Sequence, residues 1–154
     1  MFLYKYLVLS LALSLTGSVL ADPVNFHLKV TCDPQGDTQD LGTWCGKLTI
    51  FEADSMTDHD VLRVSNFCTN GEETKFDYQL FPGGDYSTSY EINYTLTHNC
   101  TIDGLVRCIK PKDSQEVSVA GETHVNFHLG AYQIGEAREC LDPNHGSIWN
   151  TIFG

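Results

Sequence analysis

Six cysteines constrain the fold of this chain most, because all of them follow a segment with the features of a secretory signal peptide. Lys5 supplies the positive charge, Leu7–Leu15 form an apolar run broken only by serines, and small Val19 and Ala21 precede an expected cleavage site. The alternative is a membrane anchor, but the run is shorter than the roughly 20 residues that a spanning helix needs. We therefore expect residues 1–21 to be removed, and an extracellular (secreted) protein with no transmembrane segment afterwards.

The remaining 133 residues are enough for one hydrophobic core, so we expect a domain over residues 22–141 and a tail over residues 142–154. An even number of cysteines in an oxidising compartment predicts three disulfides. No two cysteines form a C-x-x-C clamp, so we expect no zinc site. The six are Cys32, Cys45, Cys68, Cys100, Cys108 and Cys140.

The acidic composition excludes some partners. The signal contains Lys5 and no acid, so the mature chain has 8 Lys and Arg against 20 Asp and Glu, a formal charge of −12. Nucleic acids and anionic membranes both require clustered basic residues, so we expect neither as a partner. The acids of Asp33–Asp40 and Glu52–Asp60 lack EF-hand spacing, so solvated loops are favoured over calcium-bridged lipid contacts. We expect no cofactor and no metal.

Apolar residues alternate with polar ones in short runs separated by Gly, Asp, Asn and Pro, which is typical of β-strands with one buried face. About eight such runs and no helical stripe predict an all-β fold, a two-sheet antiparallel β-sandwich. The stretch Lys110–Gly121 suits a short helix or an irregular crossover equally. The clear runs are Phe26–Cys32, Leu48–Ile50, Phe76–Leu80, Tyr90–Leu96 and Val125–Leu129; the weaker ones are Val61–Phe67, Leu105–Ile109 and Tyr132–Ile134.

Three histidines raise the question of metal or pH chemistry. His124 and His128 lie four residues apart on a strand, about 13 Å, and share the outward phase, so surface histidines are favoured over a metal pair. His98 shares the phase of Tyr94 and Leu96. We expect it to be a buried histidine that stabilises the strand end, the alternative being a ligand-contacting or pH-sensitive residue.

Two sequons fit N-x-S/T, at Asn93 and at Asn99. If Tyr94 and Leu96 face the core, Asn93 faces solvent, where a glycan is tolerated. Asn99 is less certain because Cys100 is the middle residue of its sequon. We expect both to be N-glycosylation sites, with Asn93 the better candidate.

Several motifs follow one another in the order found in a known family. The chain resembles the nematode transthyretin-like family over about residues 24–141. The most specific matches are the strand end Thr97–Cys100 and the closing Glu136–Cys140. The others are Val30–Cys32, the acidic turn Glu52–Asp60, Thr69–Gly71 before Phe76, and Cys108 after a short loop.

The resemblance implies a secreted transthyretin-like domain whose biochemical role is mostly unassigned. Cys45 and Cys68 are additional to the family's usual four cysteines. The tail runs past the resemblance, and its Ile148, Trp149, Ile152 and Phe153 either fold back on the sandwich or remain available to a partner.

Six cysteines allow 15 connectivities, and the sequence alone does not choose between them. The strand order that the resemblance implies puts the first strand beside the last. It therefore predicts Cys32 with Cys140, Cys100 with Cys108 across a turn, and Cys45 with Cys68.

Catalysis has little support. Related transthyretin-fold enzymes hydrolyse 5-hydroxyisourate and end in Tyr-Arg-Gly-Ser, whereas this chain ends in Thr151–Gly154. Paired cysteines are not nucleophiles. We expect no catalytic residue and a non-enzymatic binding module for an extracellular protein receptor, a lipid or a small apolar ligand. The alternative is a transthyretin-fold hydrolase with an unrecognised active site.

Signal cleavage is directly testable. Expression of the full chain in a eukaryotic secretory host should release a protein whose N-terminus, read by mass spectrometry, is Asp22. A cell-associated product that retains Lys5 would contradict the prediction.

Overall fold

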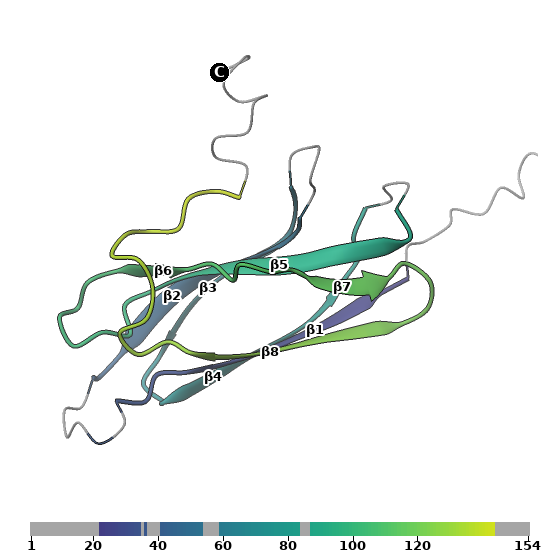
Figure 1. The fold of residues 1–154 in the computed structure, drawn as a ribbon. Coiled ribbons are helices and arrows are strands. Elements are labelled where there is room, and N and C mark those ends of the chain that lie inside the picture. Colours follow the sequence, from purple (N-terminus) through teal and green to yellow (C-terminus); the bar gives the residue numbers. More distant parts are fainter. Residues whose placement is uncertain (1–21, 35, 37–40, 54–58, 84–86, 144–154) are drawn as a thin grey trace, which may run out of the picture.

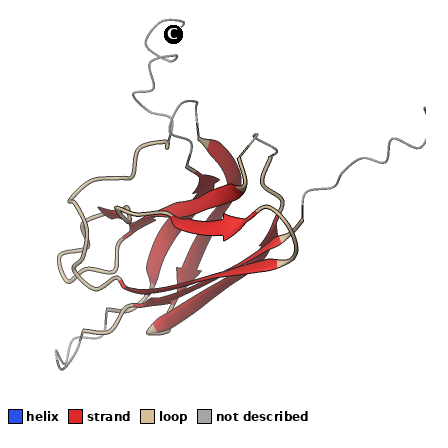
Figure 2. Ribbon diagram, turned by 45° about the vertical axis from the view of Figure 1, so that its right-hand side comes forward, coloured by secondary structure: helices blue, strands red, loops and turns tan. Residues whose placement is uncertain are grey.

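The computed structural model describes residues 22–34, 36, 41–53, 59–83 and 87–143. The expected signal peptide and most of the expected tail, residues 144–154, lie outside the described residues. The part of the chain that is described contains no helix and forms two β-sheets packed face to face (Figures 1 and 2). The predicted all-β sandwich is therefore confirmed.

Eight strands build the two sheets, and each of the clear alternating runs lies in one of them, apart from Cys32, which directly follows the first strand. The weaker Val61–Phe67 run is also a strand, whereas only the end of the Leu105–Ile109 run is. The strands are β1 (Val24–Thr31), β2 (Trp44–Glu52), β3 (Asp60–Thr69), β4 (Glu73–Leu80), β5 (Ser89–His98), β6 (Arg107–Ile109), β7 (Gln115–Ser118) and β8 (Thr123–Gly130).

Two local predictions were wrong. Tyr132–Ile134 is a turn, because Gln133 has a φ of 60° and the Ile134 N–H donates back to the Ala131 carbonyl. The stretch Lys110–Gly121 is neither a helix nor an irregular crossover, since it contains β7, which pairs with β5.

The strand order places the two ends of the domain side by side. The first sheet has the order β4-β1-β8, and the second has the order β3-β2-β5-β6 with β7 also on β5 (Figure 1). All pairs are antiparallel except β1 with β8, which run parallel. The C-terminal ends of β1, β3, β5 and β8 therefore lie at the same end of the sandwich.

The core lies between the inner faces of the two sheets. Val24, Phe26, Leu28 and Val30 of β1 are all buried, as the period of two requires. Phe26 contacts Tyr94 from the opposite sheet edge-to-face, with ring centroids 6.4 Å apart. Burial raises the pKa of Tyr94 to about 12, so its hydroxyl remains neutral in the core.

The two outer faces differ. His124 and His128 are exposed on the outer face of the first sheet, as predicted, and the His124 ring stacks on His27. On the outer face of the second sheet, Phe51 and Thr95 are buried although they have the outward phase. The segments that follow β6 and β8 cover this face. The alternation of apolar residues along a strand does not show that such a cover exists.

Three disulfides close the fold, and two of them differ from the predicted pairs. Cys45 bonds Cys68 between neighbouring strands β2 and β3, the pair that the strand order of the resemblance implies. Cys32, however, bonds Cys100, and Cys108 bonds Cys140. The predictions of Cys32 with Cys140 and of Cys100 with Cys108 are therefore wrong.

The path of the chain after β8 explains the error. The first and last strands are neighbours, as predicted, but the chain then crosses to the second sheet. There Glu136 forms an antiparallel bridge with Cys108 of β6. This crossing carries Cys140 to the outer face of the second sheet, where its N–H donates to Thr97 Oγ1 over 3.0 Å. Cys32 is left at the sheet-to-sheet boundary, facing Cys100.

Tryptic mapping without reduction distinguishes the two schemes. We expect peptides 30–47, 64–75 and 76–107 to elute as one linked set and peptides 108–112 and 139–154 as another, because these sets follow from the observed pairs. Mass spectrometry before and after reduction reads both sets.

A linked pair of peptides 76–107 and 108–112 would contradict the structure, because it requires the bond predicted from strand order. The reduced and alkylated protein is the control and should give all five peptides separately.

Candidate functional site

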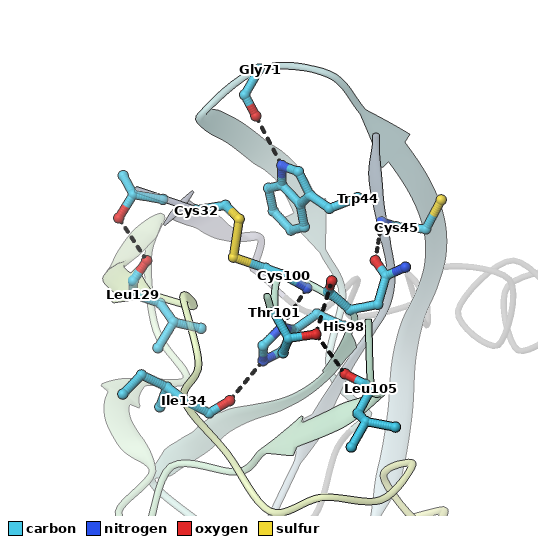
Figure 3. The surroundings of a disulfide bond; sticks show 12 residues. Cys32, Trp44, Cys45, Gly71, His98, Cys100, Thr101, Leu105, Leu129 and Ile134 are labelled. Atoms are coloured by element: carbon cyan, nitrogen blue, oxygen red, sulfur yellow. Dashed lines mark hydrogen bonds between the residues drawn. A yellow bond between two sulfur atoms is a disulfide. The ribbon is translucent and has the colours of Figure 1, made fainter. Parts of the chain in front are cut away.

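The strongest candidate for a site is the end of the sandwich where the Cys32–Cys100 disulfide joins the two sheets (Figure 3). Cys32 directly follows β1 of the first sheet, and Cys100 lies two residues after β5 of the second. Both are buried, and their Cα atoms lie 5.8 Å apart, a usual distance for a disulfide. The bond therefore holds this end of the sandwich at one separation.

His98, the last residue of β5, supports the same end with both ring nitrogens. The Cys100 N–H donates to Nδ1 over 3.2 Å, which leaves Nε2 to donate to the Ile134 carbonyl over 3.0 Å. The side chain is 1% exposed. Burial, with a smaller contribution from the charge of Arg107, lowers the pKa of His98 below its usual 6.5, so the ring is neutral. The prediction of a buried histidine that stabilises the strand end is confirmed.

The loop after β8 is attached to both sheets. Its Ala131 N–H donates to the Thr31 carbonyl over 2.7 Å, which binds it to β1. Its Gln133 N–H donates to the Cys100 carbonyl over 3.1 Å, which binds it to the second sheet. With the His98 contact, residues 130–134 are therefore held in one conformation across the sandwich end.

Trp44 fills the neighbouring space beside the disulfide (Figure 3). Its ring packs edge-to-face on Phe67, with centroids 5.2 Å apart, and its Nε1 donates to the Gly71 carbonyl over 2.8 Å. This hydrogen bond satisfies the only polar atom of a buried side chain and fixes the loop between β3 and β4.

An open cavity of about 730 Å³ lies against this framework. The polar part of its lining is acidic, from Asp33, Glu72 and Glu73, and the apolar part includes Tyr132 and Ile134. Glu73 forms ion pairs with Lys29 and Lys75, and these hydrogen bonds lower its pKa. The full lining is Thr31, Asp33, Pro34, Glu72, Glu73, Gly130, Tyr132 and Ile134.

The side chains at this end of the sandwich determine what the site can do chemically. All six cysteines are paired, so no thiolate nucleophile exists. Within the described ranges, no group of three or more His, Cys, Asp or Glu side chains is placed to hold a metal ion. The cavity lining is a concave surface that offers carboxylates beside an aromatic ring and an exposed aliphatic side chain, Ile134.

The two sequons lie in different environments, and the expectation that Asn93 faces solvent is wrong. Asn93 does not face solvent; it is 4% exposed, although its position has the outward phase. Asn99 is partly exposed beside Cys45. The burial of Asn93 follows from the segment after β6, which lies over the outer face of β5 and accepts its hydrogen bonds.

Sequence reasoning missed the cavity residues on the loop after β8. The sequence predicts a weak strand over Tyr132–Ile134, and nothing in the spacing of these residues indicates that they line a surface. The available signal was Gly130 and Gly135 on either side of them, since glycines that bracket a short segment favour turns.

Fold and site together define a small, disulfide-bonded, all-β domain with an open cavity at one end of the sandwich. Residues 27–143 match the family described as Caenorhabditis elegans protein of unknown function (DUF870), and the chain belongs to this family. No curated protein and no solved structure matches the chain.

The described residues include no helix that is long and apolar enough to cross a bilayer. Three disulfides fit an extracellular protein, because reducing compartments disfavour them.

The neutral state of His98 predicts acid sensitivity. Because its pKa is lower in the folded protein than in the unfolded chain, protonation favours unfolding. Its contribution to stability is present above pH 6.5 and is lost as the pH falls through 6.5 towards the lowered pKa. Chemical denaturation at pH 7.5 and 5.0 should show a larger loss of unfolding free energy for the native chain than for His98→Gln.

The matched control is His128→Gln, which removes an exposed histidine of β8 and should show the same difference between the two pH values as the native chain. An equal loss in the native chain and in His98→Gln would contradict the assignment.

Proposed function

We propose that this protein is a secreted, non-enzymatic binding module that recognises an extracellular protein through the cavity at the Cys32–Cys100 end. The single observation that carries the proposal is this cavity, bounded by a loop that His98 and Cys100 hold in place. A preorganised surface loses little conformational entropy on binding. The signal-like N-terminus and three disulfides support secretion.

The lining favours a basic group on the partner over a lipid. Asp33 and Glu72 add negative charge to the cavity, whereas the charge of Glu73 is offset by its ion pairs with Lys29 and Lys75. The chain as a whole is acidic. A lysine or arginine of a protein would form ion pairs with carboxylates there, and its aliphatic stem would pack against the Tyr132 ring. A purely apolar ligand would remove those carboxylates from water without compensation.

A transthyretin-like relationship is part of the same proposal. It is supported by the two-sheet architecture, by the adjacency of first and last strands, and by the family-like motifs along the chain. Secretion would also present the sequons at Asn93 and Asn99 to N-glycosylation.

Charge reversal in the cavity tests the proposed surface. Immobilised protein should capture a partner from the extracellular fluid of the source organism, and Glu72→Lys or Tyr132→Ala should weaken that binding about tenfold or more, because each removes a cavity contact. Surface plasmon resonance with the captured partner measures the change.

Asp113→Lys is the matched control, since it makes the same charge change at an exposed position outside the cavity lining. Equal affinity of native, Glu72→Lys and Tyr132→Ala proteins would place binding elsewhere. A lipid found by native mass spectrometry in every preparation would favour a carrier.

A further inference from the structure

We propose that the native protein carries one N-linked glycan, on Asn99, and none on Asn93. The inference rests on the proposed secretion, because N-glycosylation occurs in the secretory pathway. Both asparagines stand on the outward phase of β5 or directly after it, in sequons of equal form. The two sites differ in the hydrogen bonds of the amide nitrogen, Nδ2, which is the atom that the sugar is attached to.

Asn93 uses its amide as a structural bridge. Nδ2 donates to the Pro111 carbonyl over 3.5 Å and to Ser114 Oγ over 3.3 Å, and Oδ1 accepts from the Tyr94 N–H over 2.7 Å. The residue is 4% exposed. Its side chain therefore binds the segment between β6 and β7 to the outer face of β5.

A sugar on Asn93 is incompatible with this packing. Glycosylation replaces one Nδ2 hydrogen with a carbohydrate ring, so at least one of the two donated hydrogen bonds is lost. The ring also needs the volume that Pro111 and Ser114 occupy. A chain modified there would have to release this segment from β5, exposing the buried face beneath it.

Asn99 has the opposite arrangement. Its Oδ1 accepts from the Cys45 N–H over 2.6 Å, which orients the amide, and no described residue accepts a hydrogen bond from its Nδ2. The residue is partly exposed next to Cys45, whose disulfide partner Cys68 is exposed. A glycan on Nδ2 leaves Oδ1 in place, so the contact with Cys45 survives.

The covalent step is a simple displacement. Nδ2 of Asn99 attacks the anomeric carbon of a lipid-pyrophosphate-linked oligosaccharide, the donor of the secretory pathway. The nitrogen–carbon bond forms, the carbon–oxygen bond to pyrophosphate breaks, and the amide loses one proton. Cys100 does not take part, and it then bonds Cys32 in the folded chain.

The experiment is site mapping on the protein secreted from a eukaryotic host. Peptide:N-glycosidase converts a glycosylated Asn to Asp, and chymotrypsin cleaves after Tyr94 and Leu96, between the two sites. We expect conversion at Asn99 alone and a single glycan in the intact mass.

Two isosteric variants form a matched pair. Asn99→Asp keeps the oxygen that accepts from Cys45 and should lose the glycan while retaining all three disulfides. Asn93→Asp loses both donors to Pro111 and Ser114, so it should keep the glycan but unfold several degrees lower in a thermal scan.

A glycan on Asn93 of folded, secreted protein would overturn the inference, as would secreted protein with no glycan. The second result leaves the binding module intact as a proposal, because secretion and partner capture are measured separately. Absence of the protein from the medium would overturn secretion and the glycan together.

Discussion

The Cys32–Cys100 disulfide is the constraint on which the sandwich end depends. Two packed sheets share side-chain contacts and no backbone ladder, so without this bond the separation of their ends would depend on packing and on the hydrogen bonds of the loop after β8. A bond between residues 68 positions apart strongly reduces the conformational entropy of the unfolded chain. The chain-entropy relation gives it a stabilisation of about 4 kcal/mol. Because both sulfurs are buried, the same bond also fills the core at this end.

Other features of this end follow from that connection. Cys100 offers its N–H to His98 and its carbonyl to Gln133, so the cysteine also organises the loop after β8. A neutral His98 then completes the attachment through Ile134. The cavity wall formed by this loop is therefore hydrogen-bonded to a residue that the disulfide holds in place, although none of the cavity-lining residues is a cysteine.

The second sheet differs from the first because the chain crosses its outer face twice. One crossing, after β6, receives the hydrogen bonds of Asn93. The other, after β8, is fastened by Cys108–Cys140 and by the bond from Cys140 to Thr97. The outer face of β5 is thus partly an interior surface, while β1 and β8 present a solvated face with exposed histidines on the other sheet.

The sequence by itself determined the fold class, the positions of most strands and the burial of His98, since the alternation of apolar residues records which side of each strand faces the core. It did not determine which cysteines pair, because pairing requires Cα atoms within about 7 Å of each other. Which cysteines come that close depends on the path of the segment after β8. Nor did the sequence reveal that Asn93 is buried or that Tyr132 lines a cavity. Alternation describes a strand and its own sheet, whereas only the tertiary structure shows which distant segment covers the other face.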